Sequence, residues 1–325
     1  MTDFSGGNKE RRKERRYYGA YCSGCAFGAM IASFLLISFF GQTILNAFGV
    51  TEGVLFYALN LLFPIIAMLS VIVFLRVKRG QGMLVLTRYA GFKPYYAVIA
   101  VAIAACMTFG FGFVNASVAE LMRKLGLKAQ GINLTMNSAG EFVLYAVTAA
   151  LLPAIFEEAF FRGVMLDGIA CFAESAFSRR NVRAVLTTAA CFAVYHGALS
   201  QFFYQFIYGA VLAFLALSCK SVFPSAAAHF INNFFVLFCA YEKLEINLFN
   251  PVGIVLGITG IIVVLTLLVF LNSRDKKAAT ESDNASRPHG CEDACAEKSL
   301  KKFWLPFGLA AFLVCVVLLV GSALL

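Results

Sequence analysis

Residues 141–166, EFVLYAVTAALLPAIFEEAFFRGVML, form an apolar run of membrane-spanning length that contains two adjacent carboxylates. A spanning helix needs ~20 apolar residues, and a charged residue at its centre costs about 2.5–3.5 kcal/mol on insertion scales. Glu157 and Glu158 lie deep in this run, and Arg162 follows about one helical turn later. Charge kept at such depth indicates a functional site inside a membrane.

The composition of the whole chain supports a membrane protein. Of 325 residues, 60% are hydrophobic and only 14% are charged, which is far from a soluble domain. Helices are expected because backbone polar groups must be satisfied internally in lipid. The predicted fold class is therefore all-α, a polytopic bundle of eight or nine spans, which we expect at 20–46, 53–75, 95–116, 141–166, 184–200, 202–218, 222–240, 252–272 and 303–325.

The net charge of +9 does not indicate a nucleic-acid partner, because the basic residues follow the membrane topology. With nine alternating spans and a cytoplasmic N-terminus, 23 of the 27 Lys and Arg residues fall in cytoplasmic segments. This positive-inside bias predicts a multi-pass protein of a cell membrane, expected to be a bacterial plasma membrane. The basic tail, residues 1–19, is expected to lie against anionic lipid. The first apolar run is too long for a cleavable signal peptide, so it should remain as an anchor.

The distribution of polar and apolar segments predicts six regions. Residues 117–140 mix charged and apolar positions, which predicts a short amphipathic helix and then a polar turn. The regions are a basic cytoplasmic tail (1–19), peripheral transmembrane helices and loops (20–140), a catalytic core (141–240), a transmembrane helix (241–272), a polar cytoplasmic linker (273–302) and a C-terminal transmembrane helix (303–325).

The ten cysteines do not form a disulfide framework, since eight lie in or beside apolar spans, where cysteine behaves as a small hydrophobe. Cys22 and Cys25 have redox-motif spacing but no βαβ context. His289, Cys291 and Cys295 offer three soft ligands in the linker, one short of a closed structural zinc site.

Glu158 and Arg162 are four residues apart, so they share a helix face and can form an ion pair. Glu157 is rotated by ~100° and can face a separate cavity. One carboxylate would then be held by arginine, while the other is available as a general base acting on water. The plainer interpretation is a structural salt bridge between helices.

Two further constellations follow on separate spans. Phe192 and His196 share a face, although a lone intramembrane histidine often serves only to join helices. His229 and Asn233 project together and can both donate hydrogen bonds, as an oxyanion hole requires; Asn232 points elsewhere, in a structural role. Counted at 1.5 Å per residue, Glu157, His196 and His229 lie about 10–18 Å from the cytoplasmic ends of their spans, which predicts one shared cavity.

Together these motifs resemble the CPBP family of intramembrane proteases, also called the ABI or CAAX-protease family, which includes the type II CAAX prenyl endopeptidases. The shared pattern is Glu-Glu-x-x-x-Arg, Phe-x-x-x-His and His-x-x-x-Asn, each on its own helix. The chain has all three in order, as Glu157-Glu158…Arg162, Phe192…His196 and His229…Asn233, and the likeness covers about 141–240.

The resemblance implies roles for these residues. Glu157 would activate the attacking water with help from His196, while His229 and Asn233 would stabilise the oxyanion; Glu158 and Arg162 would orient the site. The family is usually called a metalloprotease, and His196, His229 and Glu158 are candidate ligands for zinc or another divalent metal. The motif also suits a glutamate-activated water without metal, and both alternatives stay open at this point.

The sequence therefore favours a hydrolase, an endopeptidase that cuts a peptide or protein substrate that is membrane-associated or lipid-modified, as in CAAX-type processing. An alternative is a non-proteolytic member of the same fold, such as a bacteriocin self-immunity factor or membrane scaffold. A third alternative is a transporter of protons or cations. Two observations argue against it: the polar residues cluster in one block, and the sequence has no inverted repeat.

Overall fold

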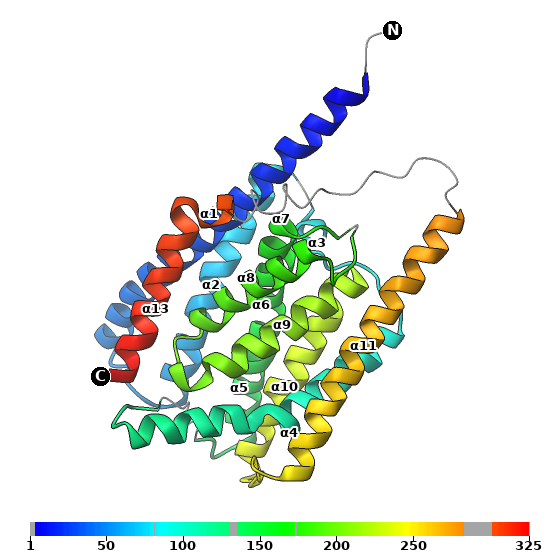
Figure 1. Cartoon of the computed structure of the whole chain (residues 1–325). Helices are drawn as coiled ribbons and strands as arrows, with labels where there is room; N and C mark the ends of the chain where they lie inside the picture. Colours follow the sequence, from blue (N-terminus) through cyan, green and yellow to red (C-terminus); the bar gives the residue numbers. More distant parts are fainter. Residues whose placement is uncertain (1–3, 81, 130–134, 173, 283–300, 325) are drawn as a thin grey trace.

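The computed structural model describes residues 4–80, 82–129, 135–172, 174–282 and 301–324. In these ranges every regular element is a helix, as predicted. The long helices pack as a bundle, with the first residues of α1 and the C-terminal end of α13 at opposite ends (Figure 1). They are α1 (Phe4–Ala47), α2 (Gly53–Arg79), α4 (Tyr95–Lys124), α8 (Arg179–Tyr195), α9 (Phe202–Cys219), α10 (Phe223–Tyr241), α11 (Pro251–Ser282) and α13 (Leu309–Leu324), the last preceded by the π-helical η4 (Trp304–Gly308).

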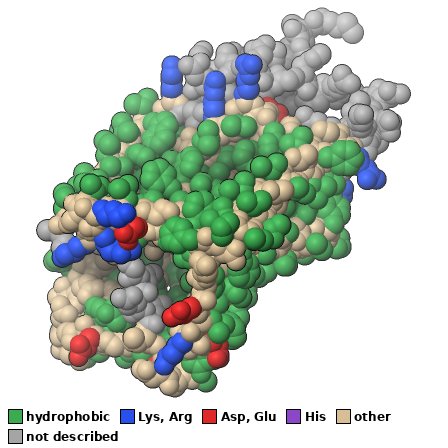
Figure 2. Space-filling model, turned by 60° about the horizontal axis from the view of Figure 1, so that its bottom comes forward, with side chains coloured by type: hydrophobic (Ala, Val, Ile, Leu, Met, Phe, Trp, Pro, Cys, Tyr) green, Lys and Arg blue, Asp and Glu red, His purple; other side chains and the backbone are tan. Residues whose placement is uncertain are grey.

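The bundle has the surface of a multi-pass membrane protein. Eight helical segments are long and apolar enough to cross a membrane. Large apolar side chains such as Phe39, Val98 and Leu256 are more than half exposed, which would be costly in water. Figure 2 shows hydrophobic side chains covering the middle of one face, with charged side chains gathered toward its edges.

One expectation about the helices was wrong, and the bounds of another helix differ from those expected. The segment expected as a span at 184–200 is α8, which has only 17 residues, carries arginines in its first turns and is not among the eight apolar helices. Its start is fixed by Ser178, whose side chain accepts from the Asn181 N–H. In addition, residues 117–124 continue α4 to Lys124 rather than forming a separate helix. Charged residues, Arg123 and Lys124, lie in the last turn of this long apolar helix.

The carboxylate-bearing segment is a helix with two π-helical interruptions. It runs through α5 (Ala139–Tyr145), the π-helical η1 (Ala146–Leu151), α6 (Leu152–Glu158), the π-helical η2 (Ala159–Met165) and α7 (Leu166–Ile169). Pro153 lies in the first turn of α6 and has no N–H, so the carbonyl of Ala149 lacks its usual donor four residues on. Single π turns in helices often occur at functional sites.

A hydrophobic core surrounds this segment. Phe27 and Met30 of α1, with Met68 of α2, pack against Phe160 and Phe161 of η2, and all five side chains are fully buried. The peripheral helices α1 and α2 therefore pack directly against the segment that follows the carboxylates. Cys22 and Cys25 remain free thiols and line a cavity of about 490 Å³ between α1 and α2. The expected linker site at His289, Cys291 and Cys295 lies outside the described residues.

Candidate active site

Glu157 and Glu158 end α6 inside the bundle, with 7% and 0% of their surfaces exposed. Glu158 Oε1 lies 2.9 Å from Arg162 Nη1, so the structure forms the ion pair that the spacing predicts. The Arg162 side chain is also almost fully buried. Because neither charge reaches solvent, each depends on the other for compensation.

Arg162 is held on three sides. Besides Glu158, its Nη2 donates to the carbonyl oxygen of Gly209 on α9 at 3.1 Å. Its guanidinium also lies 4.3 Å from the centre of the Phe192 ring, within cation–π range. Phe192 in turn presents its ring to His196 at 4.5 Å between centroids. The motif phenylalanine thus fills the space between the arginine and the histidine.

Each histidine uses its Nδ1 to fix its ring. His229 Nδ1 lies 2.9 Å from Glu158 Oε1, and His196 Nδ1 lies 2.8 Å from the Phe192 carbonyl oxygen. Neither partner oxygen can donate as a carbonyl or an ionised carboxylate, so Nδ1 carries the proton in both rings. In the neutral rings, Nε2 is therefore left with a free lone pair.

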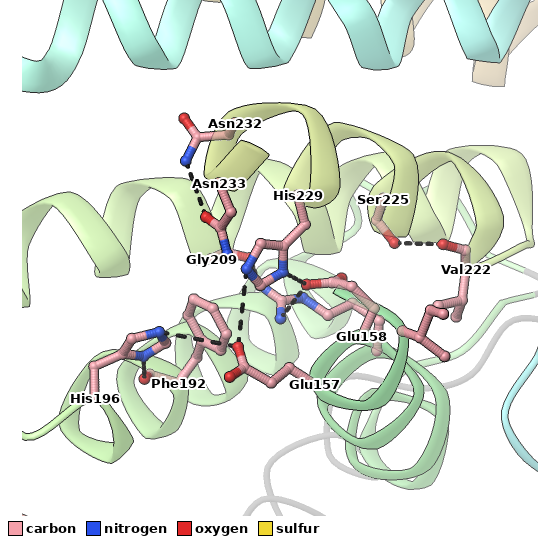
Figure 3. A network of polar contacts seen from close by, with 12 residues as sticks. Glu157, Glu158, Phe192, His196, Gly209, Val222, Ser225, His229, Asn232 and Asn233 are labelled. Atoms are coloured by element: carbon pink, nitrogen blue, oxygen red, sulfur yellow. Dashed lines mark hydrogen bonds and ion pairs between the residues drawn. The ribbon is translucent and has the colours of Figure 1, made fainter. Parts of the chain in front are cut away.

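Both Nε2 atoms converge on one oxygen of Glu157. The distance to Glu157 Oε2 is 3.9 Å from His196 Nε2 and 3.9 Å from His229 Nε2 (Figure 3). Among the described residues, this buried oxygen has no hydrogen-bond partner. Distances of this length are too long for direct hydrogen bonds but suit a bridging water. The arrangement can place one water between a carboxylate and two imidazoles.

Asn233 lies one turn beyond His229 on α10, and its amide is oriented at both ends. Its Nδ2 donates to the Ala149 carbonyl at 3.4 Å, the carbonyl that Pro153 deprives of its helical donor. Its Oδ1 accepts from Asn232 Nδ2 at 3.3 Å (Figure 3). A second hydrogen on Nδ2 therefore remains available to a bound substrate.

Sequence reasoning missed several residues that support the site. The Tyr195 side chain, directly before His196, interacts with the Glu157 carboxylate. Asn232 was expected to be structural, and its Oδ1 accepts from the hydroxyls of Thr108 and Tyr204 at 2.9 and 2.8 Å. No signal in the sequence links Thr108 or Tyr204 to this site, because both lie on other helices.

The three candidate metal ligands do not fit one ion. Glu158 binds the Nδ1 side of the His229 ring, whereas His196 faces the region of the Nε2 side. Within the part of the chain that the structure describes, no group of three His, Cys, Asp or Glu residues has a geometry that could hold a metal ion. Glu158 is moreover committed to Arg162.

Comparison with known proteins identifies the segment that carries all of these residues. Residues 139–235 match the model of the Rce1-like family, described as type II CAAX prenyl endopeptidase Rce1-like. The match covers fewer than a third of the 325 residues. No curated protein and no solved structure matches the chain. Residues 139–235, which carry the motif side chains, are thus similar to the Rce1-like, type II CAAX prenyl endopeptidase family, within a chain that has eight helical segments apolar enough to cross a membrane.

Proposed function

We propose that this protein is an intramembrane endopeptidase that hydrolyses a peptide bond with a water activated by Glu157. The observation that carries the proposal is the meeting of a buried, unpartnered oxygen of Glu157 with His196 Nε2 and His229 Nε2, each 3.9 Å away. A general base must lie within reach of the proton it removes, directly or through one water. Here the water itself would be the proton donor.

The chemistry divides among the residues. Glu157 takes a proton from water as the water oxygen attacks the peptide carbonyl carbon, and His196 Nε2 accepts a hydrogen bond from the same water. The carbonyl becomes an oxyanion, to which Asn233 Nδ2 donates. A His229 ring protonated at both nitrogens donates from Nε2 while Glu158 accepts from Nδ1. The proton on Glu157 then passes to the leaving amine, and the peptide bond breaks.

Glu158 and Arg162 act by orientation. Their ion pair joins α6 to η2 and, through Glu158 Oε1, fixes the tautomer and ring plane of His229. We assign orientation rather than base catalysis to Glu158, because its Oε1 is paired with Arg162 Nη1 and with His229 Nδ1. Its Oε2 also has no hydrogen-bond partner among the described residues, but the two Nε2 atoms converge on Glu157 Oε2 instead. The different surroundings of the two carboxylates thus support Glu157 as the base and Glu158 as the residue that orients His229.

The substrate class follows from the family description and the setting. Prenylated C-terminal CAAX peptides are the class that the family name states. A site buried among membrane-spanning helices suits a substrate that is itself embedded in or anchored to the bilayer of a cell membrane. A membrane peptide without a prenyl group, such as a pheromone or bacteriocin leader, is the alternative substrate.

The test is cleavage of a fluorogenic farnesylated CAAX peptide by purified protein in nanodiscs. Glu157→Gln is compared with the wild type and with Glu120→Gln, the same change at an exposed surface ion pair. We expect Glu157→Gln to lose at least about 100-fold in kcat/KM, since general bases contribute 10²–10⁴-fold. Glu120→Gln should cleave normally.

Full activity in Glu157→Gln would refute the proposed mechanism. No cleavage of this or of unprenylated membrane peptides by the wild type would instead favour a non-proteolytic role in immunity or scaffolding. In that case, the same Glu157→Gln variant should be examined for the cellular phenotype.

A further inference from the structure

The connection between α2 and α4 packs on the site helices instead of looping into solvent. We call residues 83–92 the strap. It begins with one short helix, α3 (Met83–Leu86), which lies near α7 in Figure 1. Leu86 and Thr87 are only 4% and 3% exposed. A connecting loop with buried residues at its centre is unusual and calls for a structural reason.

One side of the strap contacts the helix that carries Glu157 and Glu158. The Tyr89 hydroxyl donates to the carbonyl oxygen of Ile155 at 2.7 Å, two residues before Glu157. The Thr87 carbonyl lies so close to Gly163 that a Cβ added there would be 2.5 Å from the oxygen. Arg88 forms an ion pair with Asp167 on α7. These contacts bracket the carboxylates on both sides along the chain.

The other side of the strap contacts the start of the helix that carries His229. The Arg88 carbonyl accepts from the Val222 N–H at 3.0 Å, and the Ala90 carbonyl accepts from Ser221 Oγ at 2.6 Å. The Tyr89 ring packs edge-on against Phe223, 4.7 Å between centroids. The strap therefore joins the carboxylate helix to α10 at the end where α10 begins, two turns before His229.

The strap holds an unfavourable backbone conformation to make these contacts. Arg88 has a positive φ of 56°, a region that residues with a long side chain rarely adopt. Its guanidinium stacks 3.7 Å from the centre of the Phe172 ring while it pairs with Asp167. Burial and the nearby Glu158 charge raise the pKa of Tyr89, so its hydroxyl stays protonated and able to donate. Strain of this kind persists where the surroundings fix it, and it often marks functional regions.

We propose that Arg88 and Tyr89 are positioning residues for the hydrolytic reaction, because the strap sets the separation between the Glu157 helix and the His229 helix. This inference rests on the proposed function. The 3.9 Å between Glu157 Oε2 and His229 Nε2 depends on how α6 and α10 approach each other, and the strap contacts both. Misplacement of a catalytic group by about 1 Å can cost 10²-fold in rate.

The test uses two variants that each remove one contact of the strap. Arg88→Asn removes the guanidinium but keeps a residue that tolerates the left-handed backbone. Tyr89→Phe removes only the hydroxyl that donates to Ile155. The control is Leu84→Ala, a strap residue whose side chain is 62% exposed. A charge exchange, Arg88→Asp with Asp167→Arg, should restore the ion pair, since aspartate also tolerates a positive φ.

Two readouts are taken on protein in nanodiscs. The first is kcat and KM for the cleaved peptide. The second is NMR of ¹⁵N-labelled histidine, which is simple because the chain has only three histidines, and the His229 signals are assigned with His229→Gln. The NMR readout needs no cleavage, so it tests the strap even if the proposed function fails.

We expect Arg88→Asn and Tyr89→Phe each to lower kcat by about tenfold or more, with KM within about twofold, and to shift the His229 signals. The charge exchange should return kcat to within about threefold of wild type, and Leu84→Ala should match wild type in both readouts. Unchanged His229 signals in both single variants would overturn the inference, as would wild-type kcat in both. If the wild type does not cleave any tested peptide, the proposed function is refuted, while the NMR readout still decides whether the strap positions His229.

Discussion

The ion pair between Glu158 and Arg162 gives the sharpest test of how this site is held together. Replacing Arg162 with methionine leaves the Glu158 carboxylate, which is 0% exposed, without its cationic partner. Breaking a buried pair by removing one member costs about 3–5 kcal/mol. The lost hydrogen bond to the Gly209 carbonyl, worth about 1.5–3 kcal/mol for a charged donor, forms part of that loss. We expect a total near the upper end of the range.

A matched surface variant sets the scale. Arg123→Met breaks an ion pair with Glu120 in which the side chains are 65% and 44% exposed. Exposed pairs contribute about 0–1 kcal/mol, so this variant should be nearly neutral. The free energy of unfolding is measured for both variants by SDS titration in mixed micelles, where the bundle can unfold and refold.

The double variant Glu158→Gln with Arg162→Met separates charge from packing. Removing both members of a buried pair is often neutral, because no uncompensated charge remains. The glutamine oxygen can still accept from His229 Nδ1. We therefore expect the double variant to recover more than half of the stability lost in Arg162→Met. Our reasoning about the pair is refuted if Arg162→Met costs less than about 1 kcal/mol, or if the double variant is no more stable than the single one.

Three more outcomes follow from the site. Asn232→Ala removes the donor that orients Asn233, so kcat should fall by about tenfold with little change in KM, measured by peptide cleavage. Gly163→Ala forces a Cβ to 2.5 Å from the Thr87 carbonyl, so unfolding in micelles should show a loss of about 1–3 kcal/mol, while Gly91→Ala, with open space around it, should not. Chelation by EDTA or phenanthroline should leave cleavage intact, because the proposed mechanism uses a water activated by Glu157 and no group of three His, Cys, Asp or Glu side chains among the described residues could hold a metal ion; inhibition that added zinc reverses would contradict this.

The parts of the site that could be predicted from sequence are those in which the contacting residues lie about one helical turn apart on the same helix. Glu158 and Arg162 meet because residues four apart share a face, and the same rule brings His196 Nδ1 to the Phe192 carbonyl. Hydropathy also located the helices, because an apolar run of ~20 residues has few alternatives to a spanning helix. It misplaced the bounds of α8, expected at 184–200 and observed at Arg179–Tyr195, because arginines in its first turns lower the local hydropathy.

The parts that could not be predicted depend on contacts between distant segments. The sequence around Tyr89 does not indicate that its hydroxyl donates to the carbonyl oxygen of Ile155, 66 residues away. The π-helical turns on both sides of α6 are likewise not readable from apolar periodicity, although Pro153 gives a local reason for one of them. Such features arise because a close-packed interior fixes geometry through neighbours that are remote in sequence.

The two histidines differ in the group that fixes them, and this difference gives them separate roles in the proposed mechanism. The ring of His196 rests on a neutral backbone carbonyl of its own helix, at the C-terminal end of α8. The ring of His229 rests on a buried carboxylate from another helix, and that carboxylate is already paired with Arg162. A neutral acceptor favours a ring that offers its lone pair to water, whereas a carboxylate accommodates a ring that donates at both nitrogens. In the proposed mechanism, the adjacent carboxylates and paired imidazoles would supply proton acceptance beside Glu157 and proton donation toward the oxyanion, from residue types that sequence alone cannot tell apart.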